Sequence, residues 1–263
     1  MIRLRVISLG AGVQSTAMTL MAAHGEIAPM PDCAIFADTG WEPGAVYDHL
    51  TWLKALNLPF PIVEVSAGDL RQAIMDRSNT TGGRFASVPW FIQMPDGDTG
   101  MGRRQCTKEY KLRPIQREIR QRLGGTPKGA AEAWIGISTD EVLRCKPSRP
   151  QYIINRWPLI EKRLNRNDCL RWLERKGYPK PPKSACIGCP FHGDEQWRAL
   201  RTRPAEWADA VAVDTAIRQQ SGFRGQQFMH RSLRPLDEVD FSTAEDRGQL
   251  NLFNNECEGM CGT

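Results

Sequence analysis

The first 65 residues alternate between short apolar runs and segments with helical periodicity. Three apolar runs predict strands at residues 4–10, 33–40 and 60–66. Between the first two runs, residues 15–25 predict a helix that Ser15 or Thr16 caps and Gly25 ends. Residues 44–56 predict a second helix with one apolar face, formed by Val46, Leu50, Leu53 and Leu56. Strands that alternate with helices predict a parallel sheet with both faces covered.

The pattern changes after residue 77. Residues 78–105 read as one long loop, which suits a segment that covers a substrate. A helix follows with one apolar face, formed by Leu112, Ile115, Ile119 and Leu123. Residues 131–138 predict a fourth strand, and residues 165–177 a short helix with Asn165 as its cap and Gly177 after its end. We therefore expect an α/β fold, a doubly wound and mostly parallel sheet, followed by a cysteine-rich C-terminal segment.

Composition narrows the class of protein. The 263 residues are 41% hydrophobic and 25% charged, as in an ordinary globular protein. The N-terminal apolar run is too short for the core of a signal peptide, and no run of about 18 apolar residues follows. We therefore expect a cytoplasmic protein that has no membrane partner.

Positive charge is concentrated in the middle of the chain. Residues 103–122 hold eight Lys or Arg against two Asp or Glu, and residues 140–189 hold 12 against 5. Such regions suit a phosphorylated ligand or a nucleic-acid backbone, and a solvated basic face is the alternative for any single residue.

A glycine-rich turn lies between the first strand and the first helix, in the sequence VISLGAGVQST. Backbone N–H groups at such a turn, together with the positive end of the helix, can hold phosphate. Hydroxyl donors for the same ligand come from Ser8, Ser15 and Thr16. The turn lacks the Lys-Ser or Lys-Thr of a Walker A loop and the spacing of a dinucleotide fingerprint. A glycine turn that serves packing alone is the alternative.

Four segments, in order, resemble the phosphoadenosine phosphosulfate (PAPS) reductase family of the adenine-nucleotide α-hydrolase, or PP-loop, superfamily. The loop residues of this resemblance are Ser8, Gly10, Gly12, Gln14 and Ser15. The second segment is Asp38, Thr39 and Gly40, and the third is RRQCTKEYKLRPI at residues 103–115. The fourth combines IGISTDEVLRC with RWPLIE. Together they span roughly residues 4–190.

The resemblance implies a Rossmann-like PP-loop fold with an adenylyl nucleotide, ATP or PAPS, over the carboxyl ends of the strands. It places Asp38 near the adenosine or ribose. It makes Arg104, Lys108, Lys111 and Arg144 candidates for contacts to phosphate or sulfate, with a surface charge as the alternative for each. This role is favoured over a surface charge for Lys111 and Arg144, and for Lys108 the two are equal. Residues 1–160 would then form the nucleotide-binding domain.

The cysteines suggest a metal centre. Cys186 and Cys189 are spaced so that one loop can offer two thiolates to one metal. The preferred interpretation is a [4Fe-4S] cluster held by Cys106, Cys169, Cys186 and Cys189, in which the helix dipole favours a thiolate at Cys169. Zinc bound by the pair, His192 and one further thiolate is a second interpretation, and a redox dithiol is a third. Cys145 could replace Cys169, whereas Cys33 reads as a buried apolar residue.

The C-terminal tail, NNECEGMCGT, resembles the mobile Glu-Cys-Gly end of PAPS reductases. Cys257 would attack the sulfur and Cys261 would resolve the product, with an incidental tail as the alternative. Residues 161–235 would form a cysteine-rich helical segment that packs on the first domain, and residues 236–263 a mobile tail.

Two classes of function follow. The first is a PAPS reductase-like oxidoreductase, or an ATP-dependent sulfurtransferase that thiolates nucleic acid, with a thiol or sulfur donor protein as partner. The second is a non-catalytic nucleotide- or nucleic-acid-binding module with structural zinc. The sequence is compatible with a homo-oligomer.

Overall fold

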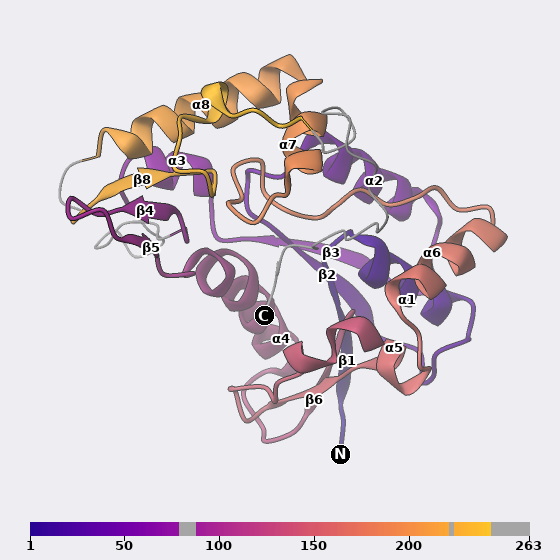
Figure 1. Cartoon of the computed structure of the whole chain (residues 1–263). Helices are drawn as coiled ribbons and strands as arrows, with labels where there is room; N and C mark the ends of the chain where they lie inside the picture. Colours follow the sequence, from indigo (N-terminus) through magenta and orange to yellow (C-terminus); the bar gives the residue numbers. More distant parts are fainter. Residues whose placement is uncertain (79–87, 221–223, 243–263) are drawn as a thin grey trace. The chain divides into compact units, whose positions relative to one another are not determined.

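The computed structural model describes residues 1–78, 88–220 and 224–242 (Figure 1). These residues form two compact units. The first consists of residues 1–67 and 109–184, and the second consists of the described residues of 68–108 and 185–242. This division differs from the expected boundaries at residues 160 and 235, because the chain leaves the first unit after its third strand and returns at residue 109.

The first unit is built on a five-stranded, all-parallel sheet with the order β3-β2-β1-β6-β7. Its strands are β1 (Leu4–Leu9), β2 (Cys33–Asp38), β3 (Ile62–Ser66), β6 (Ala131–Ile135) and β7 (Ile153–Arg156). Its helices are α1 (Val13–Ala23), α2 (Gly44–Ala55), α4 (Arg113–Leu123), α5 (Pro158–Glu161) and α6 (Arg166–Arg175), with a 3₁₀ helix, η2 (Thr139–Arg144). The four predicted strands are confirmed, and β7 is an addition.

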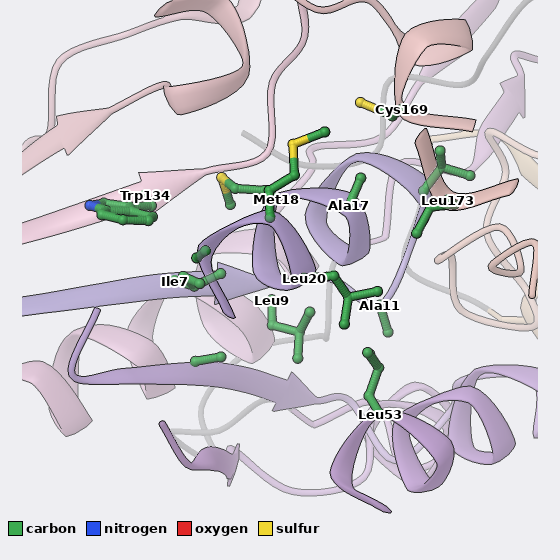
Figure 2. Close-up of a cluster of buried hydrophobic side chains, with 14 of the residues drawn as sticks. Ile7, Leu9, Ala11, Ala17, Met18, Leu20, Leu53, Trp134, Cys169 and Leu173 are labelled. Atoms are coloured by element: carbon green, nitrogen blue, oxygen red, sulfur yellow. The ribbon is translucent and has the colours of Figure 1, made fainter. Parts of the chain in front are cut away.

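Alternate residues of β1 enter two separate cores. Ile7 and Leu9 lie in a core formed with α1, α2 and α6, whereas Leu4 and Val6 lie in a core formed with α4. Figure 2 shows the first core, in which Leu173 of α6 lies beside α1. Helices therefore cover both faces of the sheet, which confirms the predicted doubly wound α/β fold.

The strand order has a reversal point between β1 and β6. The chain builds β1, β2 and β3 outward in one direction and then places β6 and β7 on the other side of β1. In open parallel sheets, ligands bind at the carboxyl ends of the strands where the order reverses. The loop after β1 and the loop after β6 meet at this point.

The start of one predicted helix differs from expectation, and the start of another agrees with it. Helix α1 starts at Val13 with Gly12 as its N-cap, so the predicted cap at Ser15 or Thr16 is wrong. The end at Gly25 is confirmed, because this residue adopts the left-handed φ of 73° that ends many helices. In α6, Asn165 is the N-cap, as predicted, and it forms a reciprocal capping pair with Asp168.

Helix α4 buries Ile119 and Leu123, as predicted, but Leu112 is exposed. The reason is local, because residues Thr107–Leu112 form a π-helix, η1. Its wider winding does not continue the 3.6-residue periodicity of α4, so Leu112 leaves the apolar face.

The second unit contains a three-stranded antiparallel sheet with the order β5-β4-β8. Its elements are α3 (Leu70–Met75), β4 (Phe91–Gln93), β5 (Thr99–Met101), α7 (Asp194–Arg201), α8 (Pro204–Arg218), β8 (Gln226–Phe228) and a 3₁₀ helix, η3 (Leu236–Glu238). The expectation of one long loop over residues 78–105 is therefore wrong. A Pro-Asp-Gly turn at residues 95–97 joins β4 to β5, and this turn signal is present in the sequence.

A buried carboxylate organises the end of the second unit. Asp214 of α8 is fully buried and accepts the backbone N–H groups of Met229 and Leu236, each at 2.9 Å. It also pairs with Arg218 one turn further along the helix. Burial raises the pKa of Asp214, and these donors act in the opposite direction. Across the described ranges, no helix is both long enough and apolar enough to cross a membrane.

Candidate functional site

The glycine turn after β1 is held together by one serine. The hydroxyl of Ser15 accepts the N–H groups of Gly10 and Gly12, each at 3.2 Å, and donates to the carbonyl of Gly12. Between the two glycines, Ala11 adopts a left-handed φ of 57°. The turn therefore presents backbone N–H groups at the start of α1, where the helix dipole favours an anion.

The loop after β6 approaches this turn closely. A Cβ atom on Gly136 would lie 2.9 Å from the backbone nitrogen of Ser15 and 3.0 Å from its Cα. Glycine at this position thus lets the loop after β6 contact the first turn of α1. The strand-end residue Ser8 lies between Ile35 of β2 and Ile135 of β6, and it is half-buried.

Gln14 joins three elements at the reversal point. Its side-chain nitrogen donates to Glu141 at 3.2 Å and to Ser138 at 3.5 Å, and its oxygen accepts from Arg166 at 3.2 Å. Glu141 in turn pairs with Arg144. The structure therefore brings together Gln14 and Arg144, two residues that the sequence singles out.

The loop after β2 forms a second group of polar side chains. The carboxylate of Asp38 accepts the N–H of Gly40 at 2.8 Å and the hydroxyl of Tyr47 at 2.9 Å. Burial and this hydrogen bond raise the pKa of Tyr47, so the phenol stays protonated. Ser66 of β3 donates to the backbone carbonyl of Asp38 at 3.0 Å, which fixes the end of the strand.

Lys111 is held by a buried glutamate. The side chain of Glu42 is 1% exposed, and its Oε1 lies 3.1 Å from the ammonium of Lys111 and accepts the hydroxyl of Thr39 at 3.0 Å. Lys111 thus occupies a fixed position near the end of β2. By contrast, the other two cationic candidates, Arg104 and Lys108, belong to the second unit.

Thr16 does not take part in the turn. It is fully buried, and its hydroxyl lies 3.0 Å from Nε2 of His49 on α2. His49 also stacks on Trp52, with ring centroids 5.1 Å apart. Burial lowers the pKa of His49 to about 4, so the ring is neutral near pH 7.

The Cys186–Cys189 pair lies on a tight turn in the second unit. The N–H of Cys189 donates to the carbonyl of Cys186 at 3.0 Å, and the N–H of His192 donates to the carbonyl of Cys189 at 3.1 Å. The ring Nε2 of His192 donates to the carbonyl of Cys186 at 2.9 Å, and the ring packs against Trp197. His192 therefore braces the turn through Nε2.

The segment that carries Cys106 contacts the segment after the pair. Arg104 hydrogen-bonds Thr107 at 3.1 Å, and its guanidinium lies over the ring of Phe191, 5.1 Å from the centroid. Cys106, Cys186 and Cys189 thus belong to one unit and are half-buried. Thiols that bind a metal are often partly exposed, and these three are.

Cys169 lies elsewhere. It is fully buried in the core of the first unit, between α1 and α6, as Figure 2 shows. Burial raises the pKa of its thiol to about 12, so desolvation outweighs the helix dipole that was expected to favour a thiolate. Cys33 is also fully buried, which agrees with its interpretation as an apolar residue, and burial raises its pKa to about 11.

No disulfide joins the cysteines of the described residues. Within the same residues, no three Cys, His, Asp or Glu side chains lie together as a metal ion requires. Cys257 and Cys261 lie outside the described residues.

Sequence reasoning missed four polar residues of the site, namely Glu42, Ser138, Glu141 and Arg166. Ser138 and Glu141 lie inside IGISTDEVLRC, part of the fourth segment that resembles the PAPS reductase family, so their place in that segment is a signal that could have found them. Glu42 follows the Asp-Thr-Gly segment by two residues. Arg166 gave no local signal, because it is 152 residues from Gln14 in the chain.

No protein-family model matches the chain, and no curated protein matches its sequence. Among solved structures, the chain is similar to a phosphoadenylyl-sulfate (PAPS) reductase from Candida auris, crystallised as a phosphate complex. The two are 14% identical, with a TM-score of 0.43, over 67% of this chain and 74% of that chain. That enzyme is of the family that the four sequence segments resemble. The α/β fold of the first unit is established by its own sheet and helices.

Proposed function

We propose that this chain is an enzyme of sulfur chemistry that binds an adenylyl nucleotide, ATP or PAPS, in its first unit. The observation that carries the proposal is the group around Gln14, which lies beside the glycine turn where the strand order reverses. Sheets of this kind bind ligands at this position. The resemblance of four sequence segments to the PAPS reductase family supports an adenylyl ligand.

The turn is prepared for phosphate by Ser15. Its hydroxyl holds the N–H groups of Gly10 and Gly12 toward one acceptor. A phosphate oxygen offers the same two donors a charged acceptor, and hydrogen bonds to charged groups are about twice as strong as neutral ones. We infer that the nucleotide phosphate takes the place of the Ser15 hydroxyl.

Two cations of the first unit are held by carboxylates. Arg144 pairs with Glu141, and Lys111 pairs with the buried Glu42. Such pairing fixes the cations in place before the ligand binds and keeps the site near neutrality. We propose that Arg144 and Lys111 contact the phosphate or sulfate groups, and that Asp38 faces the adenosine or ribose.

The reaction takes one of two forms. In the reductase form, the thiolate of Cys257 attacks the sulfonyl sulfur of PAPS, and the bond from sulfur to the phosphate oxygen breaks. The thiolate of Cys261 then attacks the sulfur of Cys257, which releases sulfite and leaves a disulfide. Two thiols are oxidised and one sulfonyl group is reduced, so a dithiol donor protein must restore the pair.

In the sulfurtransferase form, the carbonyl oxygen of an acceptor attacks the α-phosphorus of ATP, and pyrophosphate leaves. A nucleophilic sulfur from a donor then displaces AMP from the activated carbon. A nucleic-acid base is the acceptor that suits the basic composition of residues 103–122 and 140–189. A cytoplasmic setting suits both forms, because each needs reduced thiols.

We also propose that Cys106, Cys186 and Cys189 hold a [4Fe-4S] cluster. In the described residues no three such side chains lie together as ligands of one metal, so the proposal requires these thiols to approach one another when the cluster forms. Their common unit and partial exposure fit thiolate ligands. The fourth position would be open, because Cys145 and Cys169 belong to the first unit and Cys169 is buried in its core. The use of His192 Nε2 as a backbone donor favours this set over a zinc site that employs that nitrogen. A cluster of this kind would carry electrons or hold a sulfur atom.

Titration calorimetry with ATP, PAPS and GTP tests the nucleotide site. We expect an adenylyl nucleotide to bind more tightly than GTP, and Gln14→Ala or Arg144→Gln to weaken it at least tenfold, about 1.4 kcal/mol. Arg175→Gln removes an exposed charge from α6 and is the matched control. Equal affinities for wild type and Gln14→Ala would contradict the proposal.

Product and metal assays separate the remaining alternatives. Sulfite from PAPS identifies the reductase, and pyrophosphate from ATP identifies the sulfurtransferase. Cys257→Ser should abolish the first activity and leave the nucleotide affinity unchanged. Anaerobic purification should give iron, sulfide and absorbance near 400 nm that Cys186→Ser removes. A colourless protein with one zinc and no turnover would indicate the non-catalytic module instead.

A further inference from the structure

Helix α4 carries a row of arginines along one side. Arg113, Arg117 and Arg120 are all exposed, whereas another side of the helix buries Ile119 and Leu123 against the sheet. At 3.6 residues per turn, the three arginines lie within about 60° of one another around the helix axis. We call these three residues the arginine face of α4.

Among the described residues, no acidic side chain pairs with the arginine face. Through the described part of the chain, no ion pair involves any of the three, whereas Arg122 on the adjoining side pairs with Glu118 at 2.6 Å. The hydroxyl of Tyr152 donates to the carbonyl of Gln116 on the same helix at 3.2 Å. Three guanidinium groups are therefore exposed on a helix whose apolar side packs against the sheet.

The spacing of the face fits a regular polyanion. From Arg113 to Arg120 the helix rises about 10 Å, at about 1.5 Å per residue. That rise spans about three nucleotides of one strand, at about 3.4 Å per nucleotide. Each guanidinium can donate two parallel hydrogen bonds to one phosphate group. The row thus offers three cations along a stretch of about four successive phosphates.

Other acidic partners fit less well. A helix that binds a membrane surface inserts an apolar face between lipids, but the apolar face of α4 is occupied by the sheet. A protein partner is usually anchored by buried aromatic or aliphatic side chains, and the arginine face has none of its own. A phosphodiester backbone needs only the charge and the donors.

We propose that the arginine face of α4 binds the phosphodiester backbone of nucleic acid. The face lies outside the proposed nucleotide site, and its binding can be measured without nucleotide. Failure of one proposal therefore leaves the other intact. A helix that contacts only the phosphates provides affinity and positions the protein on the nucleic acid, but it does not distinguish one base sequence from another.

The test is fluorescence anisotropy with a labelled 20-nucleotide single strand and a 20-base-pair duplex, at 50 to 200 mM salt, with the full chain. We expect binding that weakens steeply with salt. In R113Q/R117Q/R120Q, the slope of log K against log salt should fall by about 2 to 3, since each phosphate contact contributes about 0.7 to 0.9. R113K/R117K/R120K should keep most of the slope, because the charges remain.

Matched variants distinguish the effect of the arginine face from the effect of total charge. R171Q/R175Q/K176Q removes two exposed arginines of α6 and the exposed lysine that follows the helix, and it should leave the slope nearly unchanged. R117Q and R122Q each remove one arginine from the same helix. R122Q should reduce the salt slope less than R117Q does, because Arg122 is paired with Glu118. The proposal fails if neither probe binds at 50 mM salt, if the α6 variant loses as much slope as the α4 variant, or if polyglutamate competes as well as unlabelled nucleic acid.

Discussion

The buried imidazole of His49 gives a prediction that can be worked through in numbers. His49 is 7% exposed, contacts Thr16 on α1 and lies against Trp52. Burial lowers its pKa from the ordinary 6.5 to about 4. Between pH 4 and 6.5 the unfolded chain therefore binds a proton at this residue that the folded chain does not bind.

The sign and size of the effect follow from linkage. The neutral, buried His49 makes its full contribution to the free energy of unfolding above pH 6.5. This contribution is lost as the pH falls from 6.5 to 4, and below pH 4 it does not change further. Each pKa unit corresponds to about 1.4 kcal/mol, so acidification from pH 7.5 to 4.5 should cost about 2.5 kcal/mol at this residue. The effect acts where α1 contacts α2, close to the glycine turn.

Urea unfolding at pH 7.5 and 4.5, with wild type and His49→Gln, isolates this contribution. Glutamine can still hydrogen-bond Thr16 but does not titrate, so the variant should gain about 2.5 kcal/mol relative to wild type on acidification. His24→Gln removes an exposed imidazole and controls for the loss of a histidine. A stability difference that stays constant within about 0.5 kcal/mol, or an NMR titration of His49 centred near pH 6.5, would refute the reasoning.

Three further predictions concern packing and a buried network. Gly136→Ala should destabilise the first unit by about 1 to 3 kcal/mol in urea unfolding, because its methyl group would overlap the backbone of the first turn of α1. Gly10→Ala should cost less stability, because a Cβ atom there meets nothing closer than 3.7 Å. Leu53→Ala should cost about 2 to 5 kcal/mol, since the side chain is fully buried, and a loss below 1 kcal/mol would mean that the core collapses to fill the space. Asp214→Ala should cost about 3 to 5 kcal/mol of stability, because two buried N–H groups and Arg218 lose their acceptor. The second unit should then become sensitive to limited proteolysis. Unchanged proteolysis would show that water replaces the carboxylate.

Local patterns were sufficient for most of the first unit. The strands with continuous apolar runs and the helix with the Asn165 cap could be read directly, because each depends on a few neighbouring residues. The errors arose where winding or turn chemistry changes within a few residues. A π-helix turns Leu112 out of its predicted face, and a Pro-Asp-Gly turn makes a hairpin of a predicted loop.

Local sequence patterns specify the alternation of strands and helices, the glycine turn after the first strand and the spacing of Cys186 and Cys189. Which side chains meet these features depends on the packing of segments that are distant in the chain. Gln14 contacts Glu141 and Arg166 across 127 and 152 residues, and no local pattern encodes such a pairing. The same holds for burial. Cys169 looked like a thiolate at a helix start, but the packing of α6 against α1 removes it from water, and desolvation outweighs the dipole.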